Sequence, residues 1–248
     1  KAILNCPIKE NAKETIEALG FSRLLTEWVI KPFFRGVLID PNLSGPADLI
    51  PFTLKMFAKG KAALPENGMG SIALSLASQV KNIRYQTEVN NISPNTIIAT
   101  DPWTAAKLLK EPSPSNGRVM TTYYYSMKKA PLNEPYLMLN GEEGLINHLA
   151  PLSLIEPSYA PKGMHLMSVN ILMEPVTESL IRQNLLRLFG QQVESWHFLK
   201  SFTINNAHPV NYPIQYSNGV VAGSYTYMPS IEYAVISGIE AAKKIMEK

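Results

Sequence analysis

The sequence predicts an α+β fold, α/β in the broader sense, in which a mixed β-sheet is flanked by helices. Three patterns support this class. Apolar residues recur at helical spacing in the first third of the chain, alternate with polar residues through the middle, and end in a strand followed by a helix. Helices first and strands afterwards are typical of α+β proteins rather than of a regular βαβ alternation.

Helices are predicted for the first third. Residues 11–30 fit two short helices that meet at Gly20-Phe21-Ser22, and Pro32 is expected to end the second one because proline has no N–H to donate. Residues 49–57 and 71–79 show the same spacing of apolar positions, so each is expected to form a further helix.

Strands are predicted for the middle of the chain. In residues 82–89 apolar and polar side chains alternate, as they do in a strand with one buried face. The same pattern or a short apolar run predicts further strands at residues 96–99, 119–127, 136–139, 165–171 and 198–204.

The last third predicts a helix, a strand and a closing helix. Residues 177–189 place Leu180, Ile181, Leu185 and Leu188 on one stripe, which indicates an amphipathic helix. Residues 219–222 form a short apolar run bounded by glycine and fit a buried strand. Residues 230–246 are expected to close the fold as a helix.

Composition excludes several functions. The net charge is only +3 and the basic residues are scattered, which argues against a nucleic-acid binder. Cys6 is the single cysteine, so no internal disulfide can form and no metal site of cysteine and histidine is expected. No apolar run approaches the ~20 residues of a membrane span. A cytoplasmic location is therefore expected, with peripheral membrane association kept as an alternative.

The most informative segment is the last strand and helix. Gly219-Val220-Val221-Ala222-Gly223-Ser224 leads through a short loop into Met228-Pro229-Ser230-Ile231 and the closing helix. A glycine at a strand end lets another group approach the backbone, and a helix start offers free N–H groups to an electron-rich atom. From these residues alone, an ordinary strand–loop–helix connection with a good cap stays the alternative.

This segment resembles a known flavin motif. GVVAG at 219–223, PSI at 229–231 and SG at 237–238 are similar to the terminal flavin motif of the amine oxidase and phytoene desaturase family of NAD(P)/FAD-dependent oxidoreductases. Further segments resemble that family in the same order: GFS at 20–22, PFFRGV at 32–37, MFA at 56–58, ALP at 63–65, GMG at 68–70, IIATDP at 97–102, AA at 105–106 and PSYAPKG at 157–163.

The resemblance implies a division of the chain. Residues 1–80 would form the helical part of a substrate domain and 111–210 its mixed sheet, while 81–110 and 211–248 would belong to the FAD-binding domain. The family's glycine-rich turn would lie before Lys1, which is not an initiator methionine. We therefore expect a chain cut from something longer, whose partner is the missing amino-terminal FAD-binding half.

The resemblance also implies a chemistry and a set of residues. The start of the closing helix would lie against the flavin ring of FAD, and hydride would pass to the flavin from a small-molecule substrate, apolar or amine. No catalytic acid or base is marked, and this chain alone is expected to be inactive. The residues implied to contact the cofactor are Val89, Gly223, Ser224, Pro229, Ser230 and Ile231.

One feature of the sequence weakens the flavin interpretation, and another imitates a dinucleotide-binding motif. The family usually has an acidic residue where this chain has Ser224, and a hydroxyl binds more weakly than a carboxylate. Gly68-Met69-Gly70 begins a G-x-G-x-x-A pattern with Glu88 at a suitable distance, but residues 61–67 do not resemble the buried strand that a diphosphate site needs. We expect a turn that begins a helix instead.

Ser224 and the missing amino-terminal half also allow a competing hypothesis. A non-enzymatic module that binds a ligand or a partner chain remains the alternative function. The four histidines, His148, His165, His197 and His208, are expected to be surface or capping residues. At least one face of Tyr123-Tyr124-Tyr125 is expected in the core. Core positions are also assigned, with an apolar substrate or membrane entrance as the alternative, to Trp28, Val29, Ile30, Phe33 and Phe34.

Overall fold

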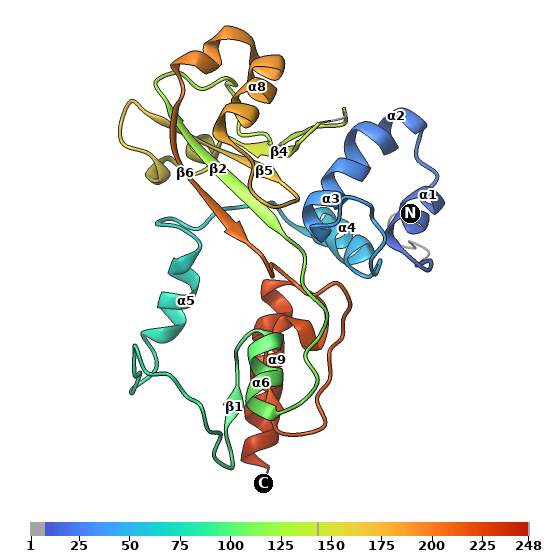
Figure 1. The fold of residues 1–248 in the computed structure, drawn as a ribbon, viewed down its shortest axis with the longest axis vertical. Coiled ribbons are helices and arrows are strands. Elements are labelled where there is room, and N and C mark those ends of the chain that lie inside the picture. Colours follow the sequence, from blue (N-terminus) through green and yellow to red (C-terminus); the bar gives the residue numbers. More distant parts are fainter. Residues whose placement is uncertain (1–7, 143, 248) are drawn as a thin grey trace.

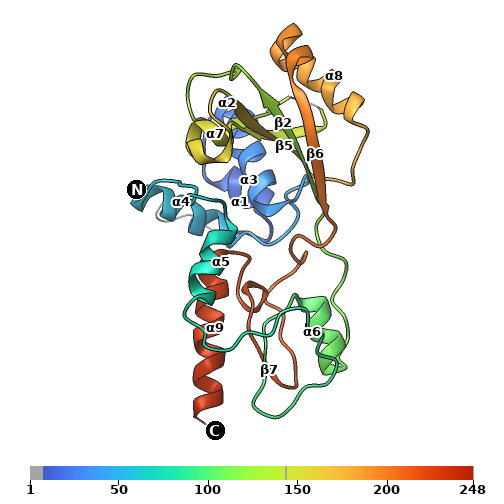
Figure 2. The same ribbon diagram turned by 90° about the vertical axis from the view of Figure 1, so that its left-hand side faces the viewer.

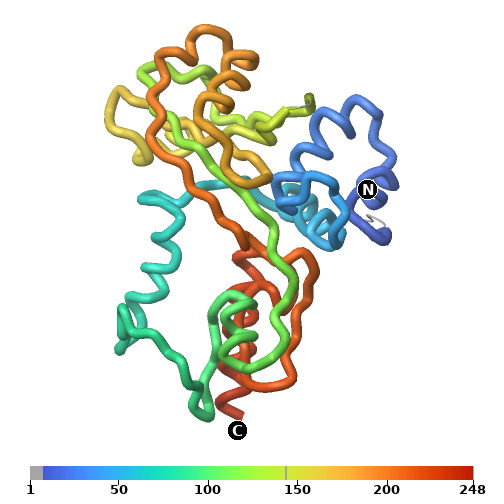
Figure 3. Tube along the Cα trace, viewed as in Figure 1, coloured from blue at the N-terminus to red at the C-terminus, as the bar shows by residue number. Residues whose placement is uncertain are grey.

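The computed structural model describes residues 8–142 and 144–247, which form an elongated molecule (Figure 1). An antiparallel sheet with helix α8 occupies one end, with the first helices beside it, and a short parallel strand pair with helices α6 and α9 occupies the other. Figure 2 shows the same arrangement from the side, and Figure 3 shows that α5 is joined to the strand pair by a long extended segment.

The elements follow the predicted order of helices before strands. The helices are α1 (Ala12–Ala18), α2 (Arg23–Leu25), α3 (Lys31–Leu38), α4 (Leu49–Lys59), α5 (Gly70–Ala77), α6 (Pro102–Leu109), α7 (Leu152–Ile155), α8 (Glu178–Phe189) and α9 (Ile231–Met246). The strands are β1 (Ile97–Ile98), β2 (Met120–Met127), β3 (Met138–Leu139), β4 (Ile146–Ala150), β5 (His165–Ile171), β6 (His197–Ile204) and β7 (Val220–Val221). Mixed helix and strand content confirms the predicted fold class.

The first helices begin where predicted, but Pro32 does not end the second one. Asn11 caps α1 and Ser22 caps α2, each by accepting a backbone N–H through its side chain. From α2 the helix widens into a π turn over Thr26–Ile30 and continues as α3 to Leu38. The prediction of a stop at Pro32 was wrong because a π turn lets a helix run on past a residue that lacks an N–H.

The main sheet has the strand order β3-β4-β5-β2-β6 and is antiparallel throughout. One face carries Tyr123 and Tyr125 of β2, which pack with Ile181 and Leu185 of α8 in a buried core. Alternation along β5 is as predicted, since Asn170 pairs with Thr122 and so lies on the opposite face. Strand β4 was not predicted.

Two predicted burial patterns were only partly right. In α8, Ile181 and Leu185 are fully buried, whereas Leu180 and Leu188 are exposed because the helix lies at the edge of the fold and presents a narrower stripe to the sheet. Among the aromatic residues assigned to the core, Phe34 is fully buried, but Trp28 is 49% exposed. Val29 is 42% exposed on the same π turn, while Ile30 and Phe33 are partly buried.

Residues 82–89 do not form the predicted strand. The segment is exposed and irregular, with a bend at Gln86, and no strand pairs with it in the described part of the chain. Alternation predicts a strand only where a neighbouring strand supplies hydrogen bonds and a buried face. Here neither is present among residues 8–142 and 144–247.

The short parallel pair joins segments from opposite halves of the chain. Ile97 pairs with Val220 and Ile98 with Val221. Helix α9 packs against both strands, and Gly219 lies against Leu109 of α6, whose side chain occupies the place of a glycine Cβ. Strand β7 is half-buried rather than buried, as one side of the pair carries no further strand among the described residues.

Asp40 ties the first helices to the sheet. Its side chain accepts the backbone N–H groups of Asn42, Ser44 and Gly45 and pairs with the Arg118 guanidinium at 2.7 Å. The carboxylate is almost completely buried, so each of these partners compensates a charge that water does not reach.

We expect Asp40→Asn to lower the free energy of unfolding by about 2–4 kcal/mol, because it breaks a buried ion pair and gives acceptor positions to a donor group. The matched control is Glu27→Gln, which breaks the partly exposed pair with Lys31 and is expected to cost about 0.5 kcal/mol. Chemical denaturation of both variants measures the difference. Equal losses would show that the Asp40 cluster does not hold the helices to the sheet.

Candidate functional site

The turn between β7 and α9 contains most of the residues that the flavin resemblance implies. Val89, in contrast, lies in the exposed segment before β1 and makes no side-chain or backbone hydrogen bond to this turn within the described residues. The structure therefore brings five of the six residues together in one connection: Gly223, Ser224, Pro229, Ser230 and Ile231.

The glycine that ends the last strand is required by the chain's own packing. Ala222 donates its N–H to the Ile98 carbonyl at 2.9 Å, and Gly223 donates its N–H to Ser237 Oγ of α9 at 2.8 Å. A Cβ on Gly223 would lie 2.3 Å from the ring of Tyr225, which is buried. The backbone at Gly223 is extended, so space rather than strain excludes a side chain.

The start of α9 is capped but not covered. Ser230 Oγ accepts the N–H of Tyr233 at 3.1 Å. Helix geometry leaves the N–H groups of Ile231 and Glu232 without partners inside the helix, and Ile231 is 55% exposed. The Glu232 carboxylate in this first turn already interacts favourably with the helix dipole, so the positive end is partly compensated within the chain.

An apolar groove runs from this helix start along α9. Its volume is about 770 Å³, and α5 forms the opposite wall. Almost all of its surface is hydrocarbon, and it is open to solvent. Monomeric proteins rarely expose an apolar groove of this size to water. The lining residues are Met69, Ile72, Ala73, Leu76, Ile231, Ala234, Val235, Gly238, Ile239 and Ala242.

The outer edge of β7 borders a different, polar cavity. Because Ala222 directs its N–H to β1, the backbone groups of Val221 point to the other side. The cavity there has a volume of about 440 Å³ and includes Tyr216, Glu240 and Lys244. The strand pair is thus open at the outer edge of β7, whereas the apolar groove lies on a different face of α9 and includes no residue of either strand.

The second face of the main sheet carries polar groups that the sequence analysis did not single out. Thr122 Oγ1 donates to Asn170 Oδ1 at 2.6 Å across β2 and β5. Tyr124 lies edge-on to Phe202 of β6, with ring centres 5.9 Å apart. His148 pairs with Asn170 in the sheet register, so it was wrongly expected at the surface or at a cap. Its burial lowers its pKa to about 4.

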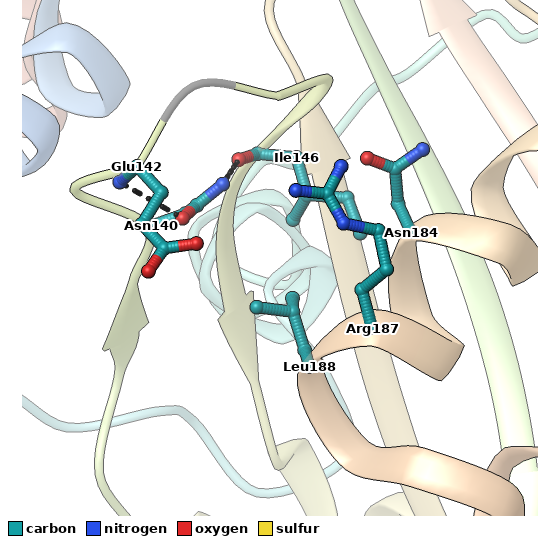
Figure 4. A pocket seen from close by; sticks show the side chains of 6 residues that line it. All are labelled: Asn140, Glu142, Ile146, Asn184, Arg187 and Leu188. Carbon is teal, nitrogen blue, oxygen red and sulfur yellow. Dashed lines mark hydrogen bonds between the residues drawn. The ribbon is translucent and has the colours of Figure 1, made fainter.

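A small polar cavity lies where the connection from β3 to β4 meets α8 (Figure 4). Asn140 Nδ2 donates to the Ile146 carbonyl at 2.9 Å, and the Glu142 N–H donates to Asn140 Oδ1 at 3.1 Å. Asn184 and Arg187 reach toward the turn from α8. With a volume of about 80 Å³ the cavity is too small for a cofactor, and its hydrogen bonds are explained by the turn itself.

The glycine pattern at residues 68–73 is a helix start, as expected. Residues 61–67 form no strand, and Ser71 Oγ donates to the Gly68 carbonyl at 2.7 Å as α5 begins. A diphosphate-binding turn after a strand does not occur within the described ranges. The same ranges contain no group of three or more metal-ligating side chains and no helix with the length and apolar character of a membrane span.

Comparisons with known proteins identify the fold. Neither the family models nor the curated protein sequences contain a match to this chain. A solved oxidoreductase from Methanosarcina mazei is similar over 100% of this chain and 70% of its own, with a TM-score of 0.72 and 15% identity. Reduced UDP-galactopyranose mutase is similar over 82% of this chain and 57% of its own, with a TM-score of 0.55 and 11% identity.

This chain has the fold of a part of those two proteins. At such low identity the likeness carries the architecture and not the chemistry. The match to the Methanosarcina protein extends over the whole chain, so the helices, the sheet and the closing strand and helix together resemble one architecture. The other 30% of that protein has no counterpart among the 248 residues.

The packing of Gly223 yields a prediction about stability. Gly223→Ala should lower the free energy of unfolding by about 1–3 kcal/mol, because the new methyl group overlaps the Tyr225 ring. Gly238→Ala is the matched control, since a Cβ there meets nothing within 4 Å and alanine favours the helix by about 1 kcal/mol. Thermal denaturation should therefore move in opposite directions. A neutral Gly223→Ala would mean that Tyr225 does not pack as described.

Proposed function

We propose that this chain is the carboxy-terminal portion of a FAD-dependent oxidoreductase of the amine oxidase and phytoene desaturase kind. The complete protein would take hydride from a carbon–carbon or carbon–nitrogen bond of an apolar or amine substrate. The observation that supports this most is the exposed start of α9, which would lie at the flavin ring if residues 219–231 act as the family's flavin motif. The match of the whole chain to an oxidoreductase fold is consistent with it.

The residues of this chain fit one end of the cofactor. Backbone N–H groups of Ile231 and Glu232 are available to an electron-rich ring edge, and Ser224 offers a hydroxyl to the ribityl chain. Because Gly223 has no side chain, the Tyr225 ring packs directly against the backbone at the end of β7. This packing holds the backbone of Ser224 in place without a ligand. These groups can orient the ring and favour negative charge on it. When bound, FAD would supply the hydride acceptor.

The other end of the cofactor requires a second piece of protein. The described residues contain no turn for the diphosphate, the strand pair is open at its outer edge, and the α5–α9 groove is an open apolar surface. We propose that the amino-terminal FAD-binding half covers both surfaces. An apolar surface of that half would exclude water from the groove. The partial positive charge at the start of α9 would then interact more strongly with the flavin, because less water screens it.

A binding module without enzymatic activity is the second candidate. It is favoured by Ser224, where a carboxylate would bind the ribityl chain more strongly. It is also favoured by Glu232, whose carboxylate at the helix start opposes negative charge on a reduced flavin. The two candidates differ in whether the complete polypeptide contains flavin.

The flavin proposal predicts colour and its loss on one substitution. The complete polypeptide should purify with a flavin absorption band, and Ile231→Asp should remove at least nine-tenths of that band, because it places a carboxylate against the ring. An aspartate in the first turn favours the helix, so the melting temperature of the 248-residue chain, in which this groove is open, should not fall. The control is Leu24→Asp at another exposed apolar position, which should keep the band. A colourless complete polypeptide would contradict the proposal.

The covered groove predicts opposite effects of one substitution in two contexts. Ile239 lies in the groove and is 52% exposed. In the 248-residue chain, Ile239→Asp should increase the monomer fraction measured by light scattering. In the complete polypeptide it should lower the free energy of unfolding by about 2–4 kcal/mol, because the carboxylate would be buried unpaired. Leu24→Asp should have the same small effect in both. If Ile239→Asp left the free energy of unfolding of the complete polypeptide unchanged, the groove would be shown to stay open there.

A further inference from the structure

An apolar cavity with a single polar group lies between α3 and the edge of the sheet formed by β3 and β4. Helix α3 packs against β4 beside the sheet (Figure 1). The cavity has a volume of about 190 Å³ and is open to solvent on one side. Its lining consists of Phe33, Gly36, Val37, Leu137, Leu139 and His148.

Hydrogen bonds fix which nitrogen of His148 carries the proton. Asn147 Nδ2 donates to the Pro32 carbonyl at 3.2 Å, so this atom is the amide nitrogen and not the oxygen. The same nitrogen lies 3.0 Å from His148 Nδ1. Since an amide NH₂ can only donate, Nδ1 accepts and the neutral ring is protonated at Nε2.

The protonated nitrogen is available to a ligand. Nε2 of His148 has no hydrogen-bond partner among the described residues, and it is not one of their buried unpaired atoms. It is therefore accessible, and the ring lines the cavity. Burial lowers the pKa of His148 to about 4, so the ring is neutral at pH 7 and offers an N–H without a charge.

Gly36 makes room for this imidazole. A Cβ at position 36 would lie 3.0 Å from both His148 Nδ1 and Asn147 Nδ2, closer than ordinary contact. The φ angle of Gly36 is not in the left-handed region, so its backbone conformation does not require glycine. The missing side chain thus serves the approach of α3 to the His148 ring.

The surroundings of the opening are apolar. Phe33 in the cavity wall lies edge-on to Phe57 of α4, with ring centres 5.6 Å apart, and Phe57 is 51% exposed. Leu137 on the other wall is 44% exposed. Exposed hydrocarbon around an apolar cavity favours an apolar occupant, since its entry removes both surfaces from water.

We propose that this cavity binds the carbonyl or ether end of a neutral, otherwise apolar small molecule, whose oxygen accepts a hydrogen bond from His148 Nε2. A cation is disfavoured because the ring presents a donor, and an anion because the ring is neutral and the other walls are hydrocarbon. The inference does not depend on flavin, since every group that forms the cavity belongs to α3, β3, β4 and the residues next to them.

Two matched probes test the proposal on the 248-residue chain. Cyclohexanone carries the acceptor, and methylenecyclohexane has the same shape without it. Nitrogen-15 NMR of labelled histidine should show His148 protonated at Nε2, and cyclohexanone should shift this signal with about three- to tenfold higher affinity than the alkene, as expected for one net hydrogen bond. A proton on Nδ1, equal affinities, or no shift with either probe would overturn the proposal.

Substitutions separate the hydrogen bond from the apolar contact. His148→Phe keeps a ring of similar size but removes the donor, so binding measured by ligand-detected NMR should lose its preference for the ketone. His197→Phe, at the opposite edge of the sheet, should keep that preference. A ketone preference retained by folded His148→Phe would overturn the proposal. If this variant does not fold, the wild-type histidine spectrum and the two affinities decide it.

Discussion

The parallel pairing of β1 with β7 is the contact on which the remaining architecture depends. Parallel strands cannot be joined by a tight turn, so the chain between them must leave the pair and return. Here it builds α6, the whole antiparallel sheet and α8 before Val220 comes back beside Ile97. The hydrogen bond from Gly223 to Ser237 then sets the position of α9 on the strand it follows. Two residue pairs of the strands and one serine of α9 thus fix where the start of α9 lies.

Elements with a strong local pattern could be predicted from sequence, and elements that depend on distant partners could not. Strands β2 and β5 and helix α9 show clear periods, and α9 begins at a recognisable N-cap, Ser230. The alternation in residues 82–89 is equally clear, but a strand needs a neighbour, and no sequence pattern reports whether one is present. The predicted helix end at Pro32 failed for a related reason, because residue types alone do not indicate a π turn.

The candidate site shows the same limit at the level of single residues. The sequence could locate the strand–turn–helix of residues 219–231, because its glycine, proline and serine follow one another. It could not reveal that Tyr225 already occupies the space beside Gly223. A glycine that matches a cofactor motif can thus be fully explained by internal packing. The flavin interpretation therefore depends on the exposed helix start and not on Gly223. The burial of His148 was not predicted, because no pattern in the adjacent residues indicates that α3 packs over it.

The two apolar surfaces of the molecule differ in a way that indicates different occupants. The groove between α5 and α9 is long and open and has almost no polar group, and the outer edge of β7, on a different face of α9, has free backbone groups. A polypeptide can pair with a strand edge and can also cover a long apolar surface, which is why we propose the amino-terminal half as the occupant of both. The cavity beside α3 is a quarter of that volume and contains one oriented N–H, which suits the single acceptor of a small molecule. The surface proposed for assembly and the cavity proposed for a ligand are thus separate, and α4 lies between them, with Phe52 of α4 in contact with Tyr233 of α9.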